Sequence, residues 1–147
     1  MRAAWFACGA AISLALLLSG CGMSQLERHT TAAGILHAGT GIAASVVDEG
    51  AREAAAGAGD ADELAEALRP WRRAEAVQHL AAAAVDAYVA EVLVMAATDA
   101  GEPDTTRALR ALRGAVSAYA ALAELLRTLG VDIPPVGRVL AVVGGAL

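Results

Sequence analysis

The stretch LRALRGAVSAYAALAELL, residues 109–126, carries the strongest periodic pattern of the chain. Its apolar residues recur at spacings of three and four, the a and d pattern of a helix that packs along one side. The residues of this stripe are Leu109, Leu112, Val116, Tyr119, Ala123 and Leu126. The pattern predicts a helix that starts after Pro103, with Asp104 as N-cap, and that ends at Gly130.

Two earlier helices are predicted from their caps and stripes. The first should run from about Gln25 to Ala56, because Ser24 and Glu27 have the spacing of a capping box. The second should start after Asp60, where Glu63 repeats that spacing. The predicted stripes are Leu26, Ala33, Leu36, Ile42, Val46 and Val47 in the first helix, and Val77, Leu80, Ala84, Tyr88, Val92 and Met95 in the second.

Glycine and proline interrupt these helical patterns. We read Pro70 as a kink in one continuous helix; the alternative is a short helix that ends near Leu68 and a new helix with Pro70 at its first position. Gly34, Gly39 and Gly41 mark either a kink in the first helix or a place where another helix approaches closely. A phosphate-binding loop is not expected there, because no Lys follows and no strand precedes.

The composition favours helices throughout. Alanine makes up 39 of the 147 residues, and only five residues are aromatic. We predict an all-α fold: an antiparallel three-helix bundle, because short loops make neighbouring helices run in opposite directions, with the middle helix kinked near Pro70. The third helix is shorter than the second, so we expect a short apolar C-terminal helix, about Val136 to Val143, to cover the remaining gap.

Charge and histidine content argue against several kinds of site. The net charge is -5, whereas nucleic-acid binding needs basic surface, so no nucleic-acid partner is expected. His29 and His37 are eight residues apart, or about 12 Å along a helix, and His79 lies on another helix. No cluster has the spacing of metal ligands, and no nucleophile motif is present, so we expect no metal, no cofactor and no catalytic residue.

The arginines gather in two places, residues 69–73 and 107–113. One interpretation is a patch for anionic headgroups or phosphorylated glycans. The interpretation that we favour is two solvated helix faces, paired with Glu66, Glu75 and Glu102. The aromatic residues Trp71, Tyr88 and Tyr119 lie on apolar stripes, so we expect them to pack in the core.

The first twenty residues have the order of a secretory signal, with Arg2 before an uncharged apolar run over residues 3–18. This run is short for a membrane span of about 20 residues. It ends in Leu18-Ser19-Gly20-Cys21, which resembles the lipobox of bacterial lipoprotein precursors. The resemblance implies cleavage between Gly20 and Cys21 and acylation of Cys21. The alternatives are a plain signal peptide or an uncleaved anchor.

By that resemblance, residues 1–20 are a lipoprotein signal peptide and residues 21–147 the mature helical domain. The mature chain is then held on a bacterial cell membrane or outer membrane through Cys21, and Gly22 favours the outer membrane. Cys8 leaves with the signal, so no free thiol remains. The first helix should begin shortly after the lipid, which keeps the folded part close to the membrane.

Three functional hypotheses follow. The first is a non-enzymatic, membrane-anchored envelope lipoprotein that binds an unknown envelope protein or acts as a scaffold, with a homo-oligomer compatible with its apolar stripes. The second is a metal binder or enzyme whose polar groups converge in the bundle core. The third comes from the general layout, which is similar to small helical lipoproteins of tailed phages and prophages and implies a role in host lysis or superinfection exclusion.

Overall fold

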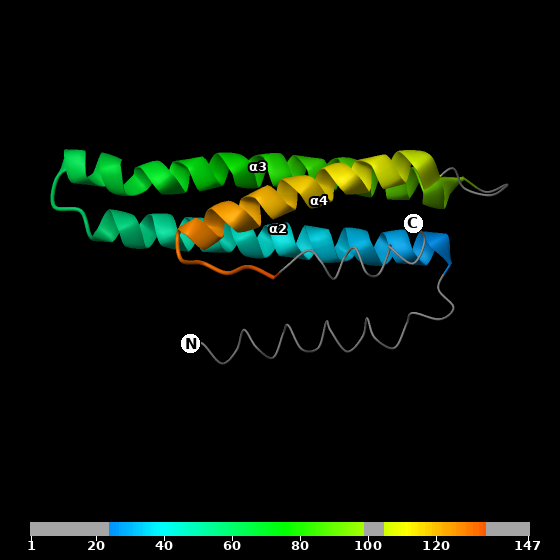
Figure 1. Ribbon diagram of the computed structural model, residues 1–147, viewed down its shortest axis with the longest axis horizontal. Helices are drawn as coiled ribbons and strands as arrows, with labels where there is room; N and C mark the ends of the chain where they lie inside the picture. Colours follow the sequence, from blue (N-terminus) through cyan, green and yellow to red (C-terminus); the bar gives the residue numbers. More distant parts are fainter. Residues whose placement is uncertain (1–23, 99–104, 135–147) are drawn as a thin grey trace.

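The computed structural model describes residues 24–98 and 105–134, and in this part of the chain the protein is all helical (Figure 1). Three helices, α2 (Gln25–Ala56), α3 (Ala61–Ala97) and α4 (Thr105–Thr128), pack together, and the described residues contain no strand. The predicted all-α class is therefore confirmed. The signal segment 1–20, Gly20 and Cys21 of the lipobox, and the C-terminal helix expected at 136–143 lie outside the described residues.

The chain reverses direction between successive helices, so α2 and α3 lie side by side and α4 returns along α3 (Figure 1). α3 packs on both other helices, whereas α2 and α4 meet over a much smaller area. α3 has 37 residues and α4 has 24. At about 1.5 Å per residue, α4 is about 20 Å shorter, and the α2–α3 pair extends beyond it at the end that carries the turn at 57–60 (Figure 1).

Of the three predicted N-caps, Asp104 lies outside the described residues, whereas Ser24 and Asp60 are both present, although the second differs in detail. The Ser24 Oγ accepts from the Glu27 N–H at 3.2 Å, and the Glu27 carboxylate accepts from the Ser24 N–H at 2.6 Å. The Asp60 carboxylate accepts from the N–H groups of Asp62 and Glu63, both at 2.9 Å. The Glu63 carboxylate, however, accepts from the Gly59 N–H at 2.8 Å, so the reciprocal bond of a capping box falls one residue earlier than predicted.

Pro70 lies inside α3, which is one continuous helix from Ala61 to Ala97. The alternative of two separate helices is therefore wrong. Proline has no N–H, so the carbonyl of Glu66, four residues earlier, lacks its normal helical donor. Packing of α3 against both neighbours outweighs that loss, because the helix has buried residues from Ala74 to Met95.

The core face of α3 is rotated slightly from the predicted stripe. Tyr88, Val92 and Met95 are buried as predicted, and Val77 and Ala84 are partly buried. Leu80, also predicted to face the core, is 68% exposed, and its neighbour Ala81 is fully buried instead. The residues of the core face are Ala74, Ala81, Val85, Tyr88, Val92 and Met95. The prediction favoured large residues, whereas closely packed helices place small ones at the contact.

A similar shift occurs in α4. Leu112, Tyr119 and Leu126 of the predicted stripe are buried, while Leu109, Val116 and Ala123 are only partly buried. The other fully covered positions are Ala108, Ala115 and Leu122. In α2, the predicted Ala33, Leu36 and Val47 are buried, but Ile42 is only partly covered. The predicted faces are right to within about one residue, because adjacent stripes of an alanine-rich helix differ little in hydrophobicity.

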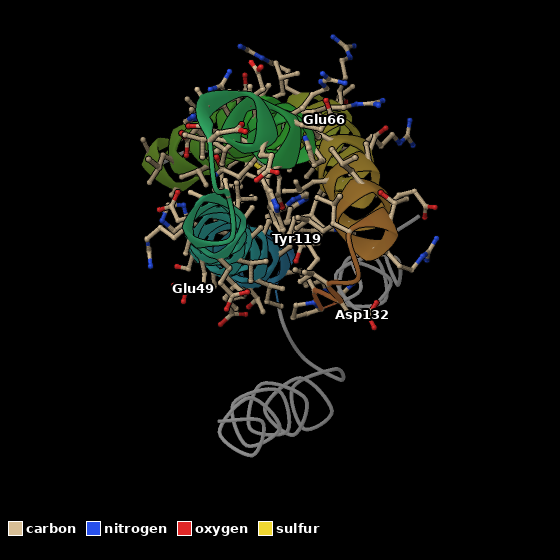
Figure 2. The ribbon with its side chains drawn as sticks, turned by 90° about the vertical axis from the view of Figure 1, so that its left-hand side faces the viewer. Glu49, Glu66, Tyr119 and Asp132 are labelled. Atoms are coloured by element: carbon tan, nitrogen blue, oxygen red, sulfur yellow. The ribbon has the colours of Figure 1, made fainter. Side chains whose placement is uncertain are left out.

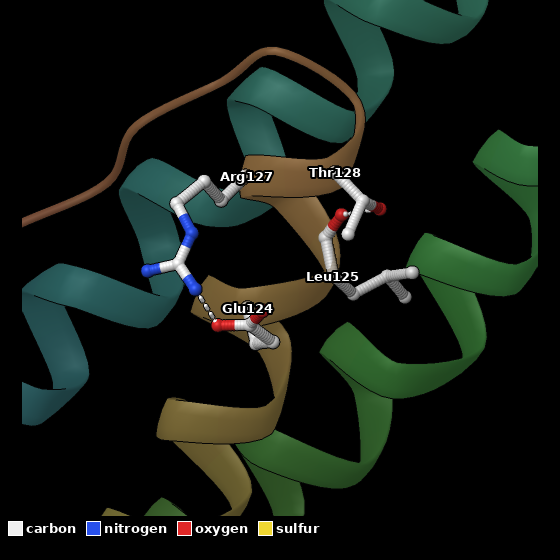
Figure 3. Close-up of polar contacts among 4 residues, drawn as sticks. All are labelled: Glu124, Leu125, Arg127 and Thr128. Carbon is white, nitrogen blue, oxygen red and sulfur yellow. Dashed lines mark hydrogen bonds and ion pairs between the residues drawn. The ribbon is translucent and has the colours of Figure 1, made fainter.

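The end of α4 closes with the glycine predicted for it. Gly130 has a φ of 82°, its N–H donates to the Arg127 carbonyl, and the Val131 N–H donates to the Leu126 carbonyl, both at 3.0 Å. This is a Schellman motif, which satisfies carbonyls that the helix leaves free. In the same turn Arg127 pairs with Glu124 (Figure 3).

After this turn the chain runs back along α4. Ile133 is buried, and the Tyr119 hydroxyl donates to the Pro134 carbonyl at 3.2 Å. Figure 2 shows Tyr119 pointing between the helices, while Glu49 and Glu66 project outward. The last described residues therefore lead away from the start of α3. The tail was expected to cover that end, and its path up to Pro134 runs in the opposite direction (Figure 1).

Candidate functional site

The predicted lipidation site is followed closely by the folded helix. Gly20 and Cys21 lie outside the described residues, and Ser24, the first described residue, caps α2. Gln25, the first residue of α2, is the fourth residue after Cys21. The Ser24 backbone N–H, and to a smaller extent the Ser24 side chain, hydrogen-bond to the Glu27 carboxylate and lower the pKa of that carboxyl, since they favour its charged form. The hydrogen bonds between Ser24 and Glu27 thus fix the residue at which α2 begins.

The three histidines do not converge. His29 is fully buried, His37 is exposed, and the side chain of His79 is 73% exposed, with its Nε2 at 3.9 Å from the Glu75 carboxylate. Within residues 24–98 and 105–134, no group of three or more His, Cys, Asp or Glu side chains is placed to hold a metal ion. The described part of the structure therefore offers no geometry to the metal-binder hypothesis.

His29 instead forms a buried polar pair with Tyr88 of α3. The His29 Nδ1 and the Tyr88 hydroxyl are 2.8 Å apart, and the same hydroxyl donates to the His29 carbonyl at 3.1 Å. The hydroxyl has one proton, so this geometry assigns the proton of the first bond to Nδ1. The His29 Nε2 then carries a lone pair, and it has no hydrogen-bond partner.

Burial sets the ionisation of this pair. Loss of solvent lowers the pKa of His29, because the interior disfavours imidazolium, and it raises the pKa of Tyr88, because the interior disfavours phenolate. Both groups are therefore neutral in the folded protein at neutral pH. Neither is accessible from solvent. The pair can fix the alignment of α2 on α3, since sliding either helix would leave buried polar atoms without partners.

Two glycines of α2 make room for aromatic rings. A Cβ at Gly39 would lie 2.8 Å from the Tyr119 hydroxyl oxygen, and a Cβ at Gly50 would overlap the Trp71 ring. Gly34 and Gly41 have nothing near their Cβ positions. The predicted close approach is thus confirmed at Gly39 alone among the three glycines singled out from the sequence. Gly50 was not singled out, because only the partner ring reveals why it is small.

The arginine clusters lie on exposed faces, as we favoured. Arg69 pairs with Glu66 at 2.7 Å, and Arg107 of α4 pairs with Glu91 of α3 at 3.0 Å. The ion-pair contact of Glu75 is with His79 rather than with an arginine, and Glu102 lies outside the described residues. These exposed pairs contribute about 1 kcal/mol or less each. The two clusters thus behave mainly as solvated surface.

An open cleft lies where α4 does not reach. It encloses about 340 Å³ between α2 and α3, with Trp71 and Leu68 on one side and Val47 on the other. Its charged lining residues are Asp48, Arg52, Arg72 and Glu75. Two acids and two arginines give it no net charge, and its apolar wall is Trp71. Trp71 is only partly buried, so the prediction that it packs in the core holds in part.

The outer side of α3 presents apolar residues to solvent. Leu80, Leu93 and Val94 are 68%, 64% and 56% exposed. A second stripe with alternating spacings of four and three runs along this side, and it could have been found from the sequence. By length and composition alone, α2 and α3 are each apolar enough to cross a membrane, as core helices of soluble proteins also are.

His29 is the residue that sequence reasoning missed most clearly. It precedes Ala33 and Leu36 by four and seven residues, so helical spacing places it on the same stripe. That spacing predicts burial, but it does not identify Tyr88 as the partner.

No protein-family model, curated protein or solved structure matches this chain.

Proposed function

We propose that this protein is a non-enzymatic, lipid-anchored protein of the bacterial envelope, attached through Cys21, and that its helices act as a rigid binding or scaffolding module. The observation that carries the proposal is the start of α2 at Gln25, closed by the Ser24–Glu27 bonds. An acyl chain on Cys21 would be separated from folded helix by three residues. Such a short link would hold the module against the headgroups.

The packing supports a structural role for the module. The interior of the described part is apolar apart from His29, Thr40 and the hydroxyl groups of Tyr88 and Tyr119. The Thr40 hydroxyl donates to the His37 carbonyl within the same helix.

In full, the proposed fold is an antiparallel three-helix bundle with α3 bent at Pro70 and a short C-terminal helix after Pro134. The proposed location is a bacterial cell membrane or outer membrane, and Gly22 after Cys21 favours the outer membrane.

The competing explanation is a membrane span. α2 and α3 are long enough, but an 18-residue apolar window in a helix is common in protein cores as well. α3 carries Glu75, Asp86 and Glu91, which are costly at the centre of a bilayer. The lipid-anchor proposal therefore assigns membrane attachment to Cys21 rather than to these helices.

Membrane fractionation of two cysteine variants tests the proposal. Cys21→Ala removes the acylation site, whereas Cys8→Ala makes the same substitution in the segment that cleavage would remove. We expect Cys21→Ala to lose carbonate-resistant membrane association and Cys8→Ala to keep it. If Cys21→Ala stays in the membrane as firmly as wild type, the anchor is an uncleaved signal or a spanning helix, and the proposal is wrong.

A further inference from the structure

Of the three described helices, only α4 has an excess of arginine. It carries four arginines and one acid, whereas α2 has four acids and two arginines, and α3 has six acids and three arginines. Arg107, Arg110 and Arg113 are exposed and follow one another at spacings of three, so they share one side of the helix. We name these three residues the arginine face. Arg107 pairs with Glu91 of α3, whereas Arg110 and Arg113 make no ion pair with another described residue.

The fold places the arginine face near the end where α2 begins. α2 and α4 run in the same direction, and the Tyr119 ring of α4 fills the space beside Gly39 of α2 (Figure 1). Residues of the two helices at one level therefore differ by about 80 in number. Gln25, the first residue of α2, is level with the start of α4. Arg110 and Arg113 lie about five and eight residues further along, or about 8 and 12 Å.

Arg28 of α2 adds a fourth positive charge at this end. It precedes Gly39 by eleven residues, which is close to three helical turns, so both lie on the side of α2 that faces α4. By the offset of about 80, Arg28 is level with Ala108, beside the arginine face. It makes no ion pair with another described residue. The opposite end of the bundle has acids at the start of α3, namely Asp60, Asp62 and Glu63.

We infer that the bundle tilts on the membrane, with the arginine face and Arg28 against the headgroups of anionic phospholipids. The inference rests on the proposed lipid anchor, because acylated Cys21 would hold this end of the bundle at the membrane surface. Each arginine near an anionic surface strengthens attachment about fivefold, and the attraction fades within about 10 Å. Arg28 and Arg110 lie within that distance of the start of α2, and a tilt toward α4 brings Arg113 within it as well.

Phospholipid headgroups fit this surface better than a protein partner does. An arginine guanidinium donates two parallel hydrogen bonds to phosphate oxygens. The centre of a protein interface is normally apolar, whereas the large exposed apolar residues of the described part all lie on α3. Asp99, Glu102 and Asp104, between α3 and α4, lie outside the described residues and oppose the positive charge. The test therefore compares matched arginines rather than net charge.

A fluorophore on α4 tests the tilt in vesicles. Ser117→Cys places it on the exposed side of α4, four residues after Arg113, and Ala83→Cys places it at a similar level on the exposed side of α3. The protein is produced from its full-length gene and reconstituted into phosphatidylcholine vesicles that carry a headgroup quencher, with or without phosphatidylglycerol. We expect phosphatidylglycerol to increase quenching at position 117 but not at position 83, and high salt to reverse the increase.

Charge-matched double variants show whether the arginine face causes the tilt. Arg110→Gln with Arg113→Gln removes two charges from this face. Arg72→Gln with Arg73→Gln removes two exposed charges from α3, toward the opposite end, and these arginines also make no ion pair with a described residue. We expect the first double variant to lose the phosphatidylglycerol-dependent quenching at position 117 and the second to keep it. Helical content should stay at the wild-type level, because all four side chains are exposed.

The outcomes distinguish the anchor from the tilt. Quenching at position 117 that does not respond to phosphatidylglycerol, or that falls equally in the two double variants, would overturn the inference. The mass of the N-terminal peptide in the same samples reports acylation of Cys21. A bare Cys21 would contradict the lipid-anchor proposal and this inference together. An acylated Cys21 without a response to phosphatidylglycerol would contradict this inference alone, and it would show that the arginine face meets something other than anionic lipid.

Discussion

The two ends of the α2–α3 pair are built differently. All buried residues of α3, from Ala74 to Met95, lie in the part of the helix that α4 packs against. Beyond α4, toward the turn at 57–60, neither α3 before Ala74 nor α2 after Val47 has a buried residue. Two helices alone cannot enclose a side chain, whereas a third helix closes the space. The part in which α4 packs on α3 (the three-helix part) should therefore supply most of the stability. The part of α2 and α3 beyond α4 (the two-helix part) should open first.

Truncation of one leucine in each part should give the largest contrast. Leu122→Ala empties a fully buried position of α4, so we expect it to lower the free energy of unfolding by about 2–5 kcal/mol. Leu68→Ala, at the open cleft, should cost less than half as much, because its site is already partly solvated. Urea unfolding followed by circular dichroism measures both. Equal losses would contradict the division into two parts.

Loss of the Tyr88 hydroxyl should have the next largest effect. Tyr88→Phe leaves the His29 Nδ1 and carbonyl without their partner in the three-helix part, at a cost of about 1–3 kcal/mol. The matched control is Tyr119→Phe, whose hydroxyl donates a single bond of 3.2 Å in a partly buried place. We expect the control to lose less in the same unfolding assay. A neutral Tyr88→Phe would show that the pair does not hold α2 against α3.

Acid should weaken the three-helix part through His29. Its pKa is lowered in the folded state, so the unfolded chain binds more protons and the free energy of unfolding falls as pH drops below about 6.5, the ordinary value. The slope from this group cannot exceed about 1.4 kcal/mol per pH unit. His29→Gln should reduce the slope, while His37→Gln, at an exposed position, should retain it. Identical slopes in the two variants would exclude His29 as the source.

Glycine substitutions should give smaller effects with opposite signs. Gly41→Ala adds a methyl group in open space and should stabilise the protein by about 0.5–1 kcal/mol. Gly39→Ala, two residues away, meets Tyr119 in the three-helix part and should destabilise it by a similar amount. Thermal unfolding distinguishes them, and shifts of the same sign would contradict the contact.

In the two-helix part, the Trp71 ring can move to make room for a methyl group added at Gly50. Gly50→Ala should push Trp71 toward the open cleft rather than destabilise the core, because that ring is only partly buried. We expect a red-shifted tryptophan emission and a change of less than about 1 kcal/mol in the free energy of unfolding. A large loss of stability without a spectral shift would show that Trp71 is held as tightly as Tyr119.

Local sequence chemistry predicted the helices well and their faces less well. Ser24, Asp60 and Gly130 act through their own neighbours, so the helix ends were readable from the chain. Which stripe of α3 is buried depends on two other helices, and Leu80 was assigned to the wrong side for that reason. An alanine-rich helix has several similar stripes, and their hydrophobicity alone does not rank them.

The candidate sites were predictable to a similar extent. The separation of His29 and His37 along the helix argues against one metal ion held by both, and the absence of a metal site stays a prediction. The pairing of His29 with Tyr88 joins residues 59 positions apart, so it depends on how α2 and α3 align. The cleft at Trp71 exists because α4 ends early, and the chain after Gly130 turns back toward Tyr119. These are tertiary effects that no local pattern records.

The mass of the N-terminal tryptic peptide of the membrane-bound protein tests the lipid-anchor proposal most directly. Cleavage at arginine after lipoprotein processing should release a peptide of residues 21–28 whose Cys21 carries a lipid, heavier than the bare peptide by the mass of its acyl chains. An unmodified peptide of residues 3–28, with Cys8 and Cys21 both free, would instead show an uncleaved N-terminal segment and would contradict the account.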